Sequence, residues 1–96
     1  MGVDEILSSK RDEILRIAAR HGVTTIRVFG SVARGDARPD SDVDFLIETG
    51  AKTSSWFPAG LVSDLEKILG RHVDVVTVRG LHPELRDEVL DEAVPL

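Results

Sequence analysis

The apolar residues of this chain recur at two different spacings, which together predict seven elements. Apolar side chains at helical spacing predict four helices, the second of them a single turn, in residues 4–20, 31–34, 58–69 and 83–94. Runs rich in β-branched and aromatic residues predict three strands, in residues 24–29, 42–48 and 72–78. The order αβ(α)βαβα indicates an α/β (α+β) fold, in which helices pack against one mixed sheet of three to four strands.

The same pattern predicts which side chains are buried. Strand 72–78 is apolar on both faces apart from Asp74 and Thr77, so we expect a well-buried strand with a buried Asp74. The alternative is that Asp74 is a surface carboxylate on an edge strand. The pair Trp56-Phe57 is interpreted as packing at the start of helix 58–69, with an exposed partner contact as the alternative. The last helix is expected to turn four apolar residues inward: Leu85, Val89, Leu90 and Ala93.

Composition narrows the class of protein. Ninety-six residues, of which 42% are hydrophobic and 30% charged, are typical of one globular domain covering residues 1–96. The chain has no cysteine, which excludes disulfides and thiolate metal sites. No apolar run approaches the ~18 residues of a membrane span and no signal-peptide pattern begins the chain, so we expect a cytoplasmic protein without membrane contact. The net charge of −5 argues against direct nucleic-acid binding, but not against a nucleotide bound through divalent cations.

Candidate chemistry is concentrated in residues 30–44. Asp42 and Asp44 lie two residues apart on a predicted strand, so their side chains share one face at a spacing of about 7 Å. Carboxylates placed in this way repel each other, and Mg²⁺ relieves the repulsion because it takes oxygen ligands together with phosphates and waters. Two such ions can act on the attacking and leaving oxygens of a phosphoryl transfer.

A glycine turn precedes these aspartates. Gly30 ends a predicted strand where backbone must approach a ligand closely, and its neighbour Ser31 starts the short helical turn. The exposed N–H groups and the Ser31 hydroxyl can hold a triphosphate. Arg34 either contacts a phosphate or pairs with a nearby carboxylate. Asp36 and Asp40 are interpreted as turn formers.

Gly30-Ser31, ten intervening residues and then Asp42-x-Asp44 resemble the signature of the DNA polymerase beta-like nucleotidyltransferase superfamily. The form Gly30-Ser31-Val32-Ala33-Arg34-Gly35, in a chain with no further domain, resembles the minimal nucleotidyltransferase (MNT) antitoxin family. The resemblance covers nearly the whole chain and implies a nucleotidyltransferase fold. It also implies that Gly30 and Ser31 hold the triphosphate, that Asp42 and Asp44 bind Mg²⁺, and that Asp74 supplies a third metal ligand and the catalytic base.

The family resemblance further implies a partner. MNT proteins act as antitoxins of HEPN-domain ribonucleases and transfer AMP from ATP to a tyrosine of that toxin, which would form a hetero-oligomer with this chain. Because the chain has no built-in acceptor pocket, we expect the acceptor to come from another protein. Two alternatives remain: an antitoxin that neutralises its partner by binding alone, and nucleotidyl transfer to a small molecule.

Other polar residues are given structural interpretations. His21, His72 and His82 lack the spacing of metal ligands. The last helix carries an acidic set that is interpreted as a solvated face, with docking to a basic partner as the alternative: Glu84, Asp87, Glu88, Asp91 and Glu92.

Overall fold

The computed structural model describes the whole chain, residues 1–96, and contains one four-stranded mixed sheet. Its strands stand in the order β3-β2-β1-β4, with β2 parallel to β3 and β1 antiparallel to both of its neighbours. The strands are β1 (Val23–Phe29), β2 (Val43–Thr49), β3 (Val73–Thr77) and β4 (Val94–Pro95). The predicted fold class is therefore confirmed, and the short fourth strand comes from the last residues of the chain.

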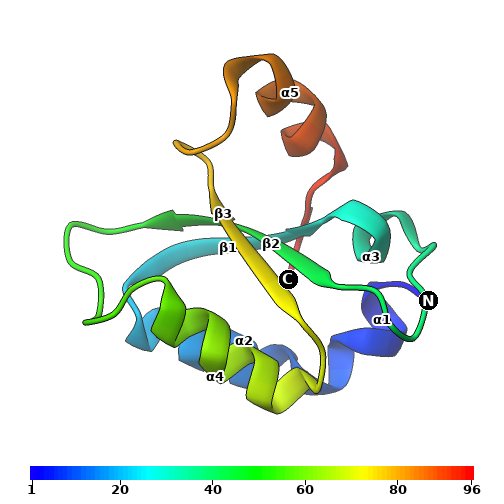
Figure 1. Ribbon diagram of the computed structural model, residues 1–96, viewed down its shortest axis with the longest axis horizontal. Coiled ribbons are helices and arrows are strands. Elements are labelled where there is room, and N and C mark those ends of the chain that lie inside the picture. The colour runs from blue at the N-terminus through cyan, green and yellow to red at the C-terminus, as the bar shows by residue number, and fades with distance from the viewer.

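The helices lie on different sides of this sheet (Figure 1). α2 and α4 lie side by side on one face, whereas α5 stands beyond the opposite face, near α3. None of the helices has the length and apolar character that a membrane crossing requires. The helical elements are α1 (Val3–Ile6), η1 (Ser8–Lys10), α2 (Arg11–Arg20), α3 (Gly30–Arg34), α4 (Ala59–Leu69) and α5 (Pro83–Glu92).

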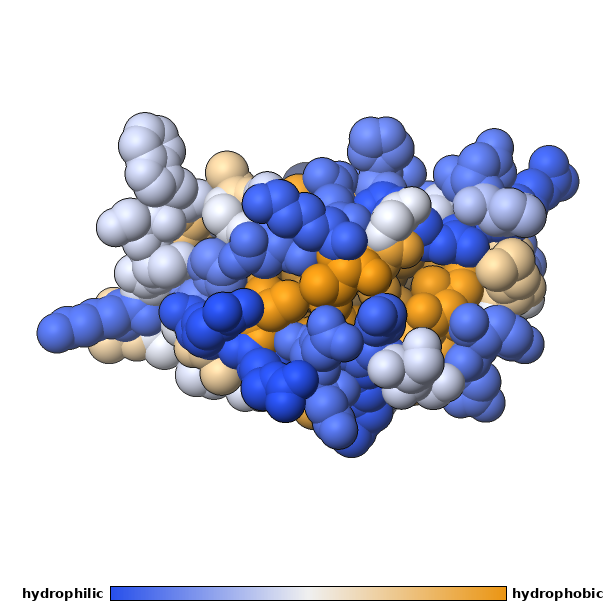
Figure 2. Space-filling model, turned by 90° about the horizontal axis from the view of Figure 1, so that it is seen from below, coloured by the Kyte–Doolittle hydropathy of each residue, from blue (hydrophilic) through white to orange (hydrophobic).

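The core lies between the sheet and the pair α2 and α4. Phe45 and Ile47 of β2 are fully buried against Ile14 of α2 and the α4 residues Leu61 and Leu65, which are equally buried. On the outer side of these helices, an apolar strip lies between charged side chains (Figure 2), with Ile17 and Ile68 lining a hollow. The apolar sides of β2, α2 and α4 thus face the core, as their sequence patterns predicted.

The first predicted helix is not continuous. Residues 4–20 form α1, a 3₁₀ turn and α2 instead of one helix. The Ser8 hydroxyl donates to the Asp4 carbonyl at 2.6 Å, and serines compete in this way with regular helical bonding. The break turns Leu7 into the core, where it is fully buried.

Three burial predictions were wrong. β3 is an edge strand, so Asp74 is exposed although its neighbours are apolar. Trp56 is 85% exposed and only Phe57 of the pair packs against the core. α5 has no fully buried residue, because Leu85 is 52% exposed and the other predicted inward residues, Val89, Leu90 and Ala93, are only half-buried. In each case the side chain lies at the periphery of the fold, which local periodicity does not reveal.

Candidate active site

The predicted site residues meet at one end of the three longer strands. β1 ends at Phe29 and Gly30 begins α3, while β2 runs back antiparallel with Phe29 opposite Asp44. In the parallel pair β2–β3, Asp44 stands opposite Asp74. Because neighbouring strands lie ~4.8 Å apart, partners in register present their side chains on the same face. Asp44 and Asp74 therefore share the sheet face away from α2 and α4, and Gly30, the first residue after β1, lies against the Asp44 carboxylate.

Gly30 is required at its position for two reasons. Its φ is +74°, a left-handed conformation that side chains other than glycine adopt at a cost. A Cβ atom built on Gly30 would collide with Oδ2 of Asp44. The absence of a side chain thus lets the backbone lie directly against the carboxylate.

The carboxylates around Asp44 create an uncompensated negative charge. Partial burial raises the pKa of Asp44 above its usual value, and the charges of Asp74, Asp42 and Glu92 raise it further, while Arg34 opposes the shift. Asp42 is exposed just before β2 begins. A cation placed among these groups would relieve the repulsion.

The carboxylates of Asp42, Asp44 and Asp74 would suit a hard divalent cation, because such cations prefer oxygen ligands. As the side chains are oriented, no three Asp, Glu or His residues gather around a single metal position. The backbone register places Asp44 beside Asp74 on the neighbouring strand.

α3 carries the other predicted ligands. Its buried Val32 fixes the turn to the core, while Ser31 is half-buried and Arg34 is exposed. Gly35 ends the helix in a left-handed conformation, with φ +84°. Arg34 binds two carboxylates, Glu92 at 3.1 Å and Asp36 at 3.4 Å, and these hydrogen bonds raise its pKa. Of the two interpretations of Arg34, pairing with carboxylates is what the structure displays.

Glu92 is the residue at this site that the sequence analysis missed. It was assigned to a solvated face, yet its Oε1 accepts a hydrogen bond from the Gly30 N–H at 2.5 Å and its Oε2 contacts Arg34. The register of β4 explains the contact, because Val94 pairs with Val28 and extension by two residues places Glu92 opposite Gly30. This proximity becomes visible only from the pairing of β4 with β1.

The histidines have structural roles, as predicted. His21 lies between Ser54 and Asp64, at 2.5 and 2.8 Å, and thereby ties the loop before α4 to α4 itself. His82 accepts a hydrogen bond from the Glu84 N–H at the start of α5. His72 contacts Glu66 at 3.4 Å.

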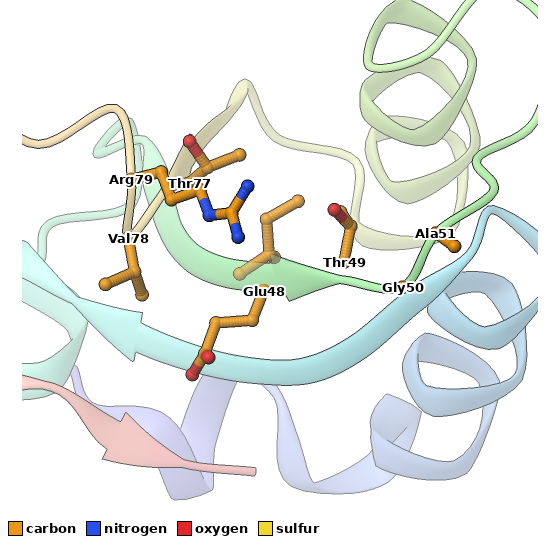
Figure 3. Close-up of a pocket in the computed structure, with 8 residues that line it drawn as sticks. Glu48, Thr49, Gly50, Ala51, Thr77, Val78 and Arg79 are labelled. Atoms are coloured by element: carbon orange, nitrogen blue, oxygen red, sulfur yellow. The ribbon is translucent and has the colours of Figure 1, made fainter.

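An open cavity of about 450 Å³ lies at the far ends of β2 and β3 (Figure 3). Its lining includes Glu48, Thr77 and Arg79, but none of the aspartates predicted for the site. The aspartates are the stronger candidates for chemistry, because Asp44 is half-buried, lies against the glycine turn and is surrounded by like charges.

Comparisons with known proteins agree on one family. Residues 11–96 match the family described as nucleotidyltransferase domain. The protein adenylyltransferase MntA of Thermococcus cleftensis is 37% identical over 92 residues, which cover 96% of this chain and 90% of that protein. A structure described as a candidate minimal nucleotidyltransferase has 47% identity and a TM-score of 0.86, covering 100% of this chain and 97% of the other.

A more distant structure shares the fold. It is a toxin–antitoxin complex with AMP-PNP, with 21% identity and a TM-score of 0.74 over 88% of this chain and 69% of that chain. At this identity the likeness concerns the arrangement of helices and strands.

Proposed function

This chain belongs to the nucleotidyltransferase family, and from that premise we propose that it acts as an MntA-type antitoxin that transfers AMP from ATP to a tyrosine hydroxyl of a HEPN-domain toxin. The family membership and the enzyme class are those that the motif predicted. The observation that carries the proposal is the pairing of Asp44 with Asp74 on neighbouring strands, with the Gly30 turn directly against the Asp44 carboxylate.

The triphosphate of ATP would bind at the start of α3. The Gly30 N–H and the Arg34 guanidinium converge on the two oxygens of one carboxylate, at 2.5 and 3.1 Å, so this pair of donors is arranged to hold an anion. Ser31 adds a hydroxyl and a backbone N–H beside them. Arginine and backbone amides are common phosphate ligands because charge-assisted hydrogen bonds are short and strong.

Asp42 and Asp44 would hold Mg²⁺ beside the triphosphate, with Asp74 as a further ligand. When bound, the metal would neutralise negative charge on the α-phosphate, which is the group that is transferred. The raised pKa of Asp44, which burial and neighbouring carboxylates cause, is consistent with a group whose natural counterion is a cation.

Asp74 would accept the proton of the incoming tyrosine hydroxyl. The tyrosine oxygen then forms a bond to the α-phosphorus, the bond from that phosphorus to the bridging oxygen breaks, and pyrophosphate leaves. The exposed position of Asp74 on edge strand β3 supports this role, because a tyrosine on another protein can reach it directly.

The partner is proposed from the relatives. The T. cleftensis relative is a protein adenylyltransferase named MntA, and the fold is shared with a member of a toxin–antitoxin complex. The exposed edge of the site supports an acceptor that comes from outside the chain.

The test is incubation of this chain with ATP, Mg²⁺ and its candidate HEPN-domain partner, followed by intact mass measurement. We expect the partner to gain one or more AMP units on tyrosine, and the Asp42→Asn/Asp44→Asn variant to give none. Absence of any mass gain with the unaltered chain refutes the proposal. If the double variant still neutralises the toxin at the same dose, neutralisation is by binding alone.

A further inference from the structure

We propose that Glu92 competes with the nucleotide for the phosphate ligands of this chain, so that α5 must move away from α3 before ATP binds. The inference rests on the proposed function, because it takes Gly30 and Arg34 to be those phosphate ligands. It adds a self-inhibiting contact that controls access to the site.

The first argument is the identity of the donors that Glu92 occupies. Its Oε1 accepts from the Gly30 N–H at 2.5 Å, and its Oε2 accepts from Arg34 Nη1 at 3.1 Å. One carboxylate therefore bridges the two groups in the way that two oxygens of a phosphate would. The Gly30 N–H has a single hydrogen, so it cannot donate to a phosphate oxygen while Glu92 accepts it, whereas Arg34 keeps further N–H groups.

The second argument is how the chain places this carboxylate. Glu92 is the last residue of α5, where the negative end of the helix disfavours an acidic side chain. Ala93 then becomes extended and β4 pairs with β1, which directs Glu92 toward Gly30. The Leu96 carbonyl accepts a hydrogen bond from Arg11 at 2.9 Å and holds the end of the chain beside α2. Glu92 thus gains its partners from α3 alone.

α5 is loosely packed against the rest of the chain, which allows it to move away from α3. It has no buried residue, and its Leu85 is 52% exposed. Arg86 of the same helix has a buried Nε atom without a hydrogen-bond partner, which costs free energy in the closed arrangement. Glu92 also faces the acidic group around Asp44, where like charges repel. The hydrogen bonds that join α5 to α3 are therefore those of Glu92 with Gly30 and Arg34.

The consequence for binding follows from population arithmetic. When only a fraction of the molecules has α5 open, the apparent dissociation constant equals the intrinsic constant divided by that fraction. A closed form that is populated about ten to one would weaken nucleotide binding about tenfold. Removal of the Glu92 carboxylate should therefore strengthen nucleotide binding about tenfold.

The experiment is titration calorimetry of the full chain with AMP-PNP and Mg²⁺. We expect Glu92→Ala to bind about tenfold more tightly than the unaltered chain, or ~1.4 kcal/mol, with Glu92→Gln between them because its amide oxygen can still accept. Glu88→Gln is the matched control, since Glu88 lies exposed on the same helix and makes no hydrogen bond or ion pair. This control should bind as the unaltered chain does.

A second measurement uses the unaltered chain and therefore does not depend on how a variant folds. Hydrogen exchange of residues 83–96 should become faster when AMP-PNP and Mg²⁺ saturate the chain, because α5 leaves its seat. Equal affinity in all four proteins, weaker binding in the Glu92 variants, or unchanged or slower exchange in residues 83–96 overturns the inference and leaves the proposed function standing. No binding by any of the four refutes the proposed function itself, and the inference with it.

Discussion

Gly30→Ala tests whether the glycine turn positions the catalytic carboxylate. The new side chain would occupy a left-handed residue with φ +74°, and its Cβ would displace the Asp44 carboxylate. Gly35→Ala is the matched control, because Gly35 has φ +84° and no atom lies within 4 Å of its added Cβ. The two substitutions therefore share the backbone strain, and only the first adds a collision.

The magnitude follows from these two contributions. A left-handed alanine costs ~1–2 kcal/mol in folding free energy, so both variants should lose about that much. For a chain of this size, 1 kcal/mol corresponds to a fall of roughly 4–8 °C in melting temperature. Gly30→Ala should lose more than Gly35→Ala by the cost of moving Asp44, and it alone should lose AMP transfer.

Thermal denaturation of both variants, together with the transfer assay, measures the two effects separately. If Gly30→Ala is as stable and as active as Gly35→Ala, the close approach of Gly30 and Asp44 has no role in catalysis. If both variants lose activity equally, the loss reports backbone strain in α3 and not a displaced carboxylate.

Asp44→Asn should raise the melting temperature at neutral pH without divalent cations, since the raised pKa of Asp44 means that ionisation of this group opposes folding. The unaltered chain should accordingly lose stability as the pH rises from 3.8, the pKa of this group in the unfolded chain, through its higher pKa in the folded chain. A lower melting temperature for Asp44→Asn than for the unaltered chain would contradict this reasoning. Phe45→Ala should cost ~3–5 kcal/mol in denaturant unfolding because Phe45 is fully buried, and a loss below about 1 kcal/mol would show that the core is misplaced. Trp56 should show the fluorescence of a solvated indole with ready quenching by iodide, and Trp56→Ala should change stability by no more than ~0.5 kcal/mol, whereas a blue-shifted and protected emission would restore the packed interpretation.

The sequence was most informative where a short-range pattern determines the structure. Alternation in residues 43–47 places Val43, Phe45 and Ile47 in the core and leaves Asp44 on the opposite face, and the structure agrees. The glycines after α2, α3 and α4 adopt the left-handed conformations expected of helix ends. These features depend on residues only a few positions apart.

Features that depend on distant parts of the chain could not be predicted in this way. The apolar residues Val73 and Val75 suggested a well-buried strand, but β3 forms the edge of the sheet and exposes Asp74. The contact of Glu92 with Gly30 arises from pairing of β4 with β1, between segments more than 60 residues apart. The family resemblance nevertheless pointed to Asp74 as a candidate site residue, and the structure places Asp74 opposite Asp44.

The most direct test asks whether Gly30, Asp44 and Asp74 form one active site. It measures the rate at which the Asp74→Asn variant transfers AMP to the HEPN partner. Asp87→Asn, which changes an exposed carboxylate of α5 away from these three residues, is its matched control. By intact mass, we expect Asp87→Asn to modify the partner at the rate of the unaltered chain and Asp74→Asn to be slower by ~100-fold or more, as for removal of a general base. Transfer by Asp74→Asn at the unaltered rate would contradict the account.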